Sequence, residues 1–226
     1  MSKESLLKKE SYNFDDLCEV VKILRAPGGC PWDAEQTHQS IRKGLIEETY
    51  EVVEGIDKDD AEILNEELGD LLLQVVFHAI IGEENGRFDI NSICDGICKK
   101  LIYRHPHVFS DVVAENSEIV LKNWEALKQK EKGQKSKAEV LNAVSSALPS
   151  LMRAQKLIKK SEIENERKDI IARIKANADR LEAGEDTAVT DIVFECARLA
   201  NTASIDLEQA LYNKNDDFLA ENCTKN

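Results

Sequence analysis

Apolar residues recur every three or four positions along most of the chain, which is the spacing of one face of an α-helix. Between Asn13 and Pro27 this spacing is followed by Phe14, Leu17, Val20, Val21 and Leu24. The apolar–polar alternation of a half-buried strand is not found over a convincing length. The pattern therefore predicts an all-α protein.

Breaks in the pattern, marked by Gly, Pro, Asn and Asp, divide the chain into further helices. We expect them at roughly 41–56, 61–82, 90–103, 140–160, 168–183, 186–203 and 207–221, with another short helix that carries 121–132. The segment 28–40 is expected to be irregular, with Trp32 filling the bundle rather than stacking on a base. The polar stretch 133–139 is interpreted as a linker between a domain of 14–132 and a second domain of 140–226.

Composition narrows the classes of function. The formal net charge of −13 argues against a surface for duplex nucleic acid, which would need a basic patch. None of the six cysteines forms a C-x-x-C pair, so a zinc site is not expected. We expect the cysteines to be reduced thiols of a cytosolic protein. The sequence shows neither the apolar run of a signal peptide nor an apolar segment long enough to span a membrane. We therefore expect a cytoplasmic protein without a membrane partner.

Acidic residues are concentrated in two of the predicted helices. Residues three or four apart share a helix face, so one helix presents Glu48 and Glu51 together, with Glu47 beside Glu51, and the next presents Glu67 and Asp70. A short turn makes these helices antiparallel neighbours, and apolar residues flank both acidic stripes. The two acidic pairs are therefore expected to face each other.

Two interpretations of the acidic stripes are open. Carboxylates crowded in a partly buried place raise one another's pKa unless a cation compensates them. Oxygen ligands without Cys or His favour Mg²⁺, with Mn²⁺ as an alternative, whereas a di-iron bundle would need Glu-x-x-His pairs. The other interpretation is a pair of solvated helix faces. His78 is expected to be packed or half-exposed rather than a ligand.

These motifs resemble those of one family. The carboxylates form E-x-x-E, fifteen residues and E-x-x-D, and they are accompanied by "GGCPWDAEQTHQSI", "EELGDLLLQVVFHA", "GRFD", "RHPHVF" and "NWEALKQKEK". The stretch from about Leu24 to Lys132 resembles the MazG family of nucleoside triphosphate pyrophosphohydrolases. The resemblance implies a four-helix-bundle-like, usually dimeric domain that uses Mg²⁺ to convert NTPs and dNTPs to the monophosphate and pyrophosphate.

The resemblance also implies roles for individual residues. The metal ligands would be Glu48, Glu51, Glu67 and Asp70, with Glu47 assisting, and the general base would be one of Glu47, Glu48 and Glu51. Lys100 and Arg104 match the family's phosphate-binding pair, although they could form a solvated basic turn. Trp124 matches an aromatic near the nucleotide and could equally belong to the core or to a dimer interface.

The second half contains a weaker repeat of the first. Residues 87–104 align on 204–221, and 69–74 on 190–195. The alignment replaces Asp70 by Asp191, Glu67 by Ala188, Lys100 by Asp217 and Arg104 by Glu221, and it places the E-x-x-E counterpart within 175–179, where Asp179 is acidic. We therefore expect a degenerate MazG-like domain that binds neither Mg²⁺ nor triphosphate, with the activity in the first half.

Three functions are compatible with these observations. The first is Mg²⁺-dependent hydrolysis of nucleoside triphosphates by a homodimer in nucleotide-pool cleaning. The second keeps the fold and narrows the substrate to one dNTP. The third is a non-enzymatic helical adaptor whose acidic face binds a basic partner.

Overall fold

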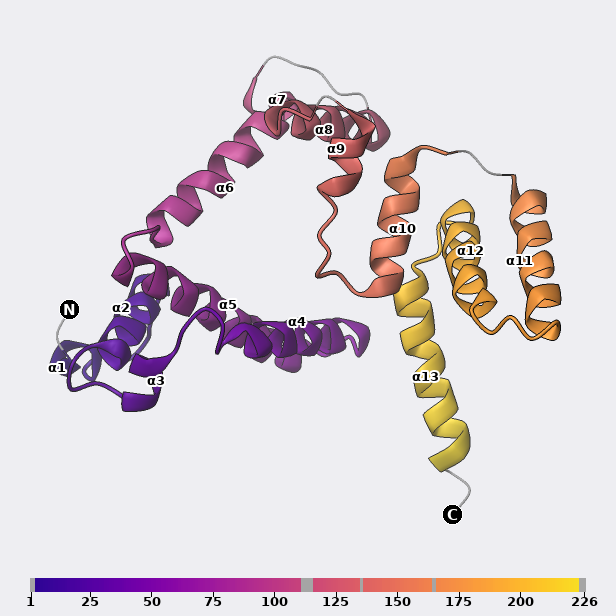
Figure 1. Ribbon diagram of the computed structural model, residues 1–226. Coiled ribbons are helices and arrows are strands. Elements are labelled where there is room, and N and C mark those ends of the chain that lie inside the picture. Colours follow the sequence, from indigo (N-terminus) through magenta and orange to yellow (C-terminus); the bar gives the residue numbers. More distant parts are fainter. Residues whose placement is uncertain (1–2, 111–115, 135, 164–165, 224–226) are drawn as a thin grey trace. The chain divides into compact units, whose positions relative to one another are not determined.

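The computed structural model describes residues 3–110, 116–134, 136–163 and 166–223, and this part of the chain contains thirteen α-helices and no strand (Figure 1). The all-α prediction is confirmed. None of the described helices is both long and apolar enough to cross a membrane. The chain divides into two compact units, Met1–Ala114 and Glu115–Asn226, and each is described by itself.

The first unit is built around a long helical hairpin (Figure 1). Its helices are α1 (Lys3–Leu6), α2 (Phe14–Arg25), α3 (Pro31–Glu35), α4 (Arg42–Asp57), α5 (Ala61–Glu84), α6 (Ile90–Arg104) and α7 (Pro106–Phe109). The apolar face of α2 packs on the second half of α5, and the core there consists of Val21, Ile41, Val76, Phe77, Ile80 and Ile81. This core holds one end of α5 and leaves its first half to pair with α4.

Side chains at the helix ends explain several boundaries. The Asn13 side chain accepts a hydrogen bond from the Asp16 backbone N–H, and the Asp16 carboxylate accepts one from the Asn13 backbone N–H, so the start of α2 is fixed by a capping box. The Asp16 side chain is buried and pairs with Lys9 Nζ at 2.5 Å. A second capping box, Asp89 with Ser92, starts α6.

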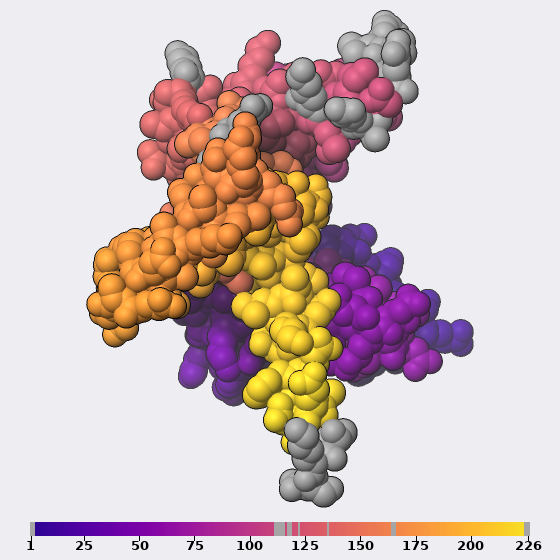
Figure 2. Space-filling model, turned by 90° about the vertical axis from the view of Figure 1, so that its right-hand side faces the viewer, coloured from indigo at the N-terminus to yellow at the C-terminus, as the bar shows by residue number. Residues whose placement is uncertain are grey.

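The second unit consists of α8 (Ser117–Glu131), α9 (Lys137–Asn142), α10 (Ser150–Ser161), α11 (Arg167–Glu182), α12 (Ala188–Thr202) and α13 (Leu207–Cys223). Here α12 packs against both α10 and α11. Gln155 on α10 donates to Asn201 and to the Ile205 carbonyl and accepts from the Leu207 backbone, which ties the α12–α13 turn to α10. Helix α13 projects away from the other helices of this unit (Figure 2, yellow).

Three expectations about local structure need correction. The segment 28–40 is not wholly irregular, because Pro31 starts the short helix α3. The helix expected at 140–160 is two helices, since α10 begins only after Pro149. Part of the expected linker is helical, with Ser136 capping α9. The division between the units precedes α8, and the functional domain limits of 14–132 and 140–226 stay a prediction.

Candidate active site

Helices α4 and α5 form an antiparallel hairpin with a tight turn. Asp59 adopts a left-handed conformation with φ of 52°, and the Asp60 N–H donates to the Gly55 carbonyl at 3.1 Å. Asp60 then caps α5 by accepting from the Glu62 and Ile63 backbones. The helices touch at Gly55, where an added Cβ would lie 2.9 Å from the Leu64 nitrogen. This contact brings the acidic stripes of the two helices together.

Three carboxylates from this hairpin converge. Glu48 on α4 and Glu67 and Asp70 on α5 each offer an oxygen, and these oxygens lie within 4.8 Å of one another. Glu48 and Glu67 are half-buried and Asp70 is exposed. The set consists of hard oxygen donors, which fits a divalent cation such as Mg²⁺ or Mn²⁺. Three of the four predicted ligands are therefore brought together.

The electrostatics of this carboxylate cluster are unfavourable without a cation. Burial raises the pKa of Glu48, and the carboxyl groups of Glu51 and Asp70 raise it further. Burial also raises the pKa of Glu67, together with the charges of Glu51, Glu66 and Asp70. Glu51 thus acts on two members of the cluster although it is not one of the three converging residues.

Two further residues of the hairpin lie beside the cluster. Glu47 forms an ion pair with Lys43 at 3.2 Å and keeps 56% of its side chain exposed, so it belongs to the outer face of α4. The side-chain amide of Gln74 lies 3.5 Å from Glu48 Oε1 and lowers the Glu48 pKa. Gln74 was not among the residues predicted for the site, although its position four residues after Asp70 places it on the same face of α5.

The predicted phosphate-binding pair is on a different helix. Helix α6 leaves the end of α5 and extends away from α4, with Lys100 and Arg104 toward its far end (Figure 1). Lys100 is exposed and Arg104 half-buried. Within one chain these two cations are not brought to the carboxylate cluster. Trp124 belongs to the second unit, where Lys128 Nζ lies 4.6 Å from the centre of its ring.

Two aromatic predictions have different outcomes. Trp32 is 67% exposed on α3, so the expectation that it fills the bundle is wrong. His78 is half-buried as expected, but it has a partner that the sequence did not indicate, because the Nδ1 atoms of His38 and His78 are 2.8 Å apart and their rings stack. Burial lowers the pKa of His78, and the nearby His38 lowers it further.

The second unit contains a hairpin of α11 and α12 that resembles the α4–α5 hairpin but has arginines among its acidic residues. Helix α11, like α4, ends at a left-handed residue, Gly184 with φ of 88°, and the next N–H donates five residues back, from Glu185 to Arg180. When the two hairpin turns are aligned on these residues, the first residues of α4 and α11 also coincide. In this alignment Arg173 occupies the position equivalent to Glu48. On this alignment the counterparts of Glu48 and Glu51 are Arg173 and Ala176, which overlap the start of the expected range 175–179, and neither residue is acidic.

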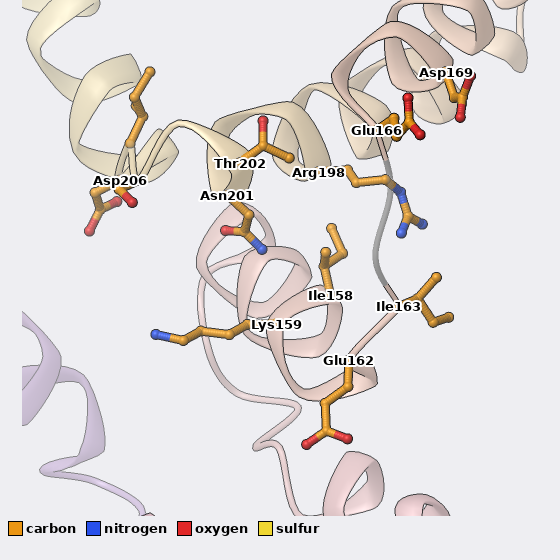
Figure 3. A pocket seen from close by; sticks show the side chains of 12 residues that line it. Ile158, Lys159, Glu162, Ile163, Glu166, Asp169, Arg198, Asn201, Thr202 and Asp206 are labelled. Carbon is orange, nitrogen blue, oxygen red and sulfur yellow. The ribbon is translucent and has the colours of Figure 1, made fainter. Parts of the chain in front are cut away.

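Arginines pair with the carboxylates that this second hairpin retains. Arg173 binds Glu195 at 2.9 Å, and Arg180 binds Asp191 at 2.8 Å and also Glu185. A large hollow of about 1170 Å³ lies nearby, between the end of α10 and the α12–α13 turn (Figure 3). Glu162 and Asp206 line different parts of this hollow, and among the described residues its carboxylates do not form a group that could hold a metal ion. It contains none of the predicted site residues.

Sequence comparison relates the chain to known proteins. The MazG nucleotide pyrophosphohydrolase domain matches residues 36–109, a range that includes the carboxylate cluster, Lys100 and Arg104 but not Trp124. The protein of Thermotoga maritima named nucleoside triphosphate pyrophosphohydrolase/pyrophosphatase MazG is 35% identical over 222 residues, which cover 94% of this chain and 85% of that protein. The chain belongs to the MazG family.

Other relatives of this MazG chain are matched over only part of their length. The nucleoside triphosphate pyrophosphohydrolase of Escherichia coli K12 is 50% identical over 147 residues, which are 65% of this chain and 56% of that protein. The uncharacterized protein YabN of Bacillus subtilis is 46% identical over 159 residues, or 70% of this chain and 32% of YabN. The matched stretch thus spans about a third of one of these relatives and just over half of the other.

Proposed function

We propose that the chain hydrolyses nucleoside triphosphates to the monophosphate and pyrophosphate, with Mg²⁺ or Mn²⁺ held by the carboxylate cluster. The observation that carries the proposal is the convergence of Glu48, Glu67 and Asp70 within 4.8 Å. The names of the Thermotoga and Escherichia relatives support it, since both are called nucleoside triphosphate pyrophosphohydrolases. The acidic residues would then be binding groups rather than a solvated surface.

Each acidic residue has a distinct part in this proposal. Glu48, Glu67 and Asp70 would hold the cation, which supplies a Lewis acid for the phosphate oxygens and lowers the pKa of a bound water. Burial, together with the neighbouring carboxylates, raises the pKa values of Glu48 and Glu67, and this unfavourable charge favours occupancy by a divalent cation. Gln74 would keep the Glu48 carboxylate oriented by donating to it.

Glu51 is the best placed of the three candidates for general base. It acts electrostatically on Glu48 and Glu67, so its carboxylate lies beside the converging oxygens without being one of them. Glu48 is itself a proposed ligand, and Glu47 is directed to Lys43 on the outer face of the helix. We infer that Glu51 accepts the proton of the water that attacks the α-phosphorus, while pyrophosphate leaves.

The experiment is product analysis with a panel of NTPs and dNTPs, with and without Mg²⁺ or Mn²⁺, separated by ion exchange. We expect monophosphate and pyrophosphate only with metal, and a loss of turnover of at least about a hundredfold in Glu48→Gln, given the size of metal-assisted effects. Glu62→Gln, an exposed change in the first turn of α5, is the matched control and should retain activity. Turnover of one dNTP alone would indicate the narrow enzyme, and no turnover of any nucleotide would favour the non-enzymatic adaptor.

We further infer that the active form is a homodimer in which α6 of one copy contributes its two cations to the carboxylate cluster on the α4–α5 hairpin of the other. Apolar side chains on α6 are exposed in the single chain, namely Ile97, Leu101, Ile102 and Tyr103, and so are Ile46, Tyr50, Leu68 and Leu72 on the hairpin. Large apolar faces of this kind mark association surfaces. A second copy covering them could bring Lys100 and Arg104 to the phosphates bound at the carboxylate cluster.

Subunit mixing tests this arrangement. Glu48→Gln and Lys100→Gln chains are each expected to be inactive, and a mixture refolded together should regain about one quarter of the wild-type rate, because half of the dimers are mixed and each has one intact site. If Glu48 and Lys100 acted within one chain, every site in the mixture would carry a defect and the rate would stay at background. Light scattering on the same samples reports whether dimers formed.

A further inference from the structure

Four lysines surround a small cavity in the second unit. The cavity has a volume of about 170 Å³ and lies between α8, α9 with the segment that follows it, and α10. Its cationic lining comes from Lys128 and Lys132 at the end of α8 and from Lys156 and Lys160 on α10. We call these four residues and the cavity between them the lysine pocket.

One carboxylate lines the same cavity, and it does not balance the lysines. Glu125 Oε1 accepts from Lys160 at 2.5 Å, and Glu125 Oε2 lies 3.9 Å from Lys128 Nζ. The lining residues therefore carry four positive charges and one negative charge, in a protein whose formal net charge is −13. A concentration of positive charge against that background is a local attraction for anions.

Two of the lysines are held in the pocket rather than extended into solvent. Only 24% of the Lys128 side chain and 20% of the Lys160 side chain are exposed. Lys128 also stacks on the Trp124 ring. Burial lowers the pKa of Lys128, and Lys160, Lys132 and Lys156 lower it further against the opposing effect of Glu125. The positive charges thus repel one another as the carboxylates of the first unit do, with the opposite sign.

The remaining walls limit what could enter. Val140, Val144 and Leu148 close the apolar side, and Gln134 and Ser145 offer polar groups. The cavity is a small hole rather than a basic stripe or groove, so the extended backbone of a nucleic acid does not match it. A small ion with several negative oxygens could be surrounded by the lysine ammonium groups through charge-assisted hydrogen bonds.

We propose that the lysine pocket binds a small, multiply charged phosphate anion, such as orthophosphate or pyrophosphate, without a metal ion and separately from the carboxylate cluster. The anion would neutralise the excess charge that Glu125 leaves and would join α8 to α10. This proposal does not rest on the proposed hydrolysis, because it involves neither Glu48 nor the residues near it. The same chemistry could come from the phosphates of a nucleotide, and the test separates these sources.

The test is calorimetric titration of the full chain, freed of divalent ions, with orthophosphate, pyrophosphate and ATP. We expect saturable binding of pyrophosphate that weakens about a hundredfold in the double variant Lys128→Gln/Lys156→Gln, since each lost charge-assisted hydrogen bond is worth about tenfold. The matched control is Lys159→Gln/Lys175→Gln, which removes two exposed charges from the same unit outside the lysine pocket and should bind as the wild type does. Glu48→Gln should also bind normally.

Specific outcomes would overturn the proposal. They are the absence of saturable binding, an equal loss in the pocket variant and in its control, and a change of affinity in Glu48→Gln, which would place the anion at the carboxylate cluster instead. Tighter binding of ATP through the same lysines would support the site and identify a nucleotide as the source of the phosphate. If the double variant is unfolded by circular dichroism, Lys156→Gln alone changes an exposed side chain and should weaken binding about tenfold.

Discussion

The Arg173 guanidinium donates from Nε to Glu195 Oε2 at 2.9 Å in the second hairpin. The equivalent positions in the first hairpin hold Glu48 and Gln74, which also lie beside each other. The two pairs are equivalent because Arg173 aligns with Glu48 and Glu195 follows Asp191 as Gln74 follows Asp70. In the second hairpin a side-chain cation therefore compensates the acidic residues. Charge compensation in this hairpin thus comes from arginine, and the expectation that the second half is not the catalytic one stays a prediction.

Replacing Arg173 by Gln should destabilise the second unit without reducing nucleotide turnover. Only 12% of the Glu195 side chain is exposed, so loss of the pair leaves a poorly solvated charge, while Arg198 at 3.4 Å compensates in part. Because 41% of the Arg173 side chain is exposed, we expect a loss of about 1–2 kcal/mol in the free energy of unfolding. Urea denaturation measures the loss, and an equal fall in turnover would contradict the assignment.

Glu48→Gln should have opposite effects with and without metal. In the metal-free protein the change removes one of several repelling carboxylates, so the melting temperature should rise by roughly 2–4 °C. Adding Mg²⁺ should raise the melting temperature of the wild type by binding only the folded state, and this rise should be much smaller in the variant. Differential scanning fluorimetry over a range of Mg²⁺ concentrations measures both effects. An unchanged response to Mg²⁺ in the variant would remove Glu48 from the ligand set.

Gly55→Ala should separate the two helices of the first hairpin. The new methyl group would lie 2.9 Å from the Leu64 nitrogen and 3.0 Å from its Cα, and backbone atoms cannot move aside as a flexible side chain can. We expect a loss of about 1–3 kcal/mol in unfolding free energy and weaker Mg²⁺ binding. Gly69→Ala, which meets no atom within 4 Å on the same hairpin, is the control and should show neither effect.

The stability of the first unit should depend on His78 at mildly acidic pH. Burial lowers the pKa of His78 in the folded state, so below its unfolded pKa of about 6.5 the unfolded chain binds more protons at this residue. The free energy of unfolding should therefore fall as the pH is lowered through that value. His78→Phe should reduce this dependence because it cannot be protonated, whereas His107→Phe on α7 should not. Urea titrations between pH 8 and pH 5.5 compare the three proteins, and equal slopes would refute the assignment.

Much of the fold was predictable because its helices carry their own boundaries. The hydrophobic spacing and the caps of α2, α5 and α6 are local, so the expected ranges agree with the observed helices to within a few residues. Helix α3 is too short to show a period. The break before α10 depends on Pro149, which the periodic pattern around it concealed.

The candidate site was predictable only where spacing alone determines proximity. Glu67 and Asp70 share a face of one helix, and a short turn brings Glu48 to them. The direction of α6 does not follow from its own sequence, so the separation of Lys100 and Arg104 from the cluster could not be foreseen. The His38–His78 contact joins a loop to a helix, and Trp32 is exposed on α3, a short helix without a buried residue.

The ion pair between Lys9 and Asp16 makes the residues that precede α2 part of the fold. Asp16 is 1% exposed, and its principal cationic partner comes from the residues that precede α2. Removing those residues by protease or by gene truncation would leave an ionised carboxylate enclosed in protein without that partner. The segment from Lys3 to Lys9 is thus not a dispensable tail, and a version of this protein that begins after it should be more easily digested and less soluble.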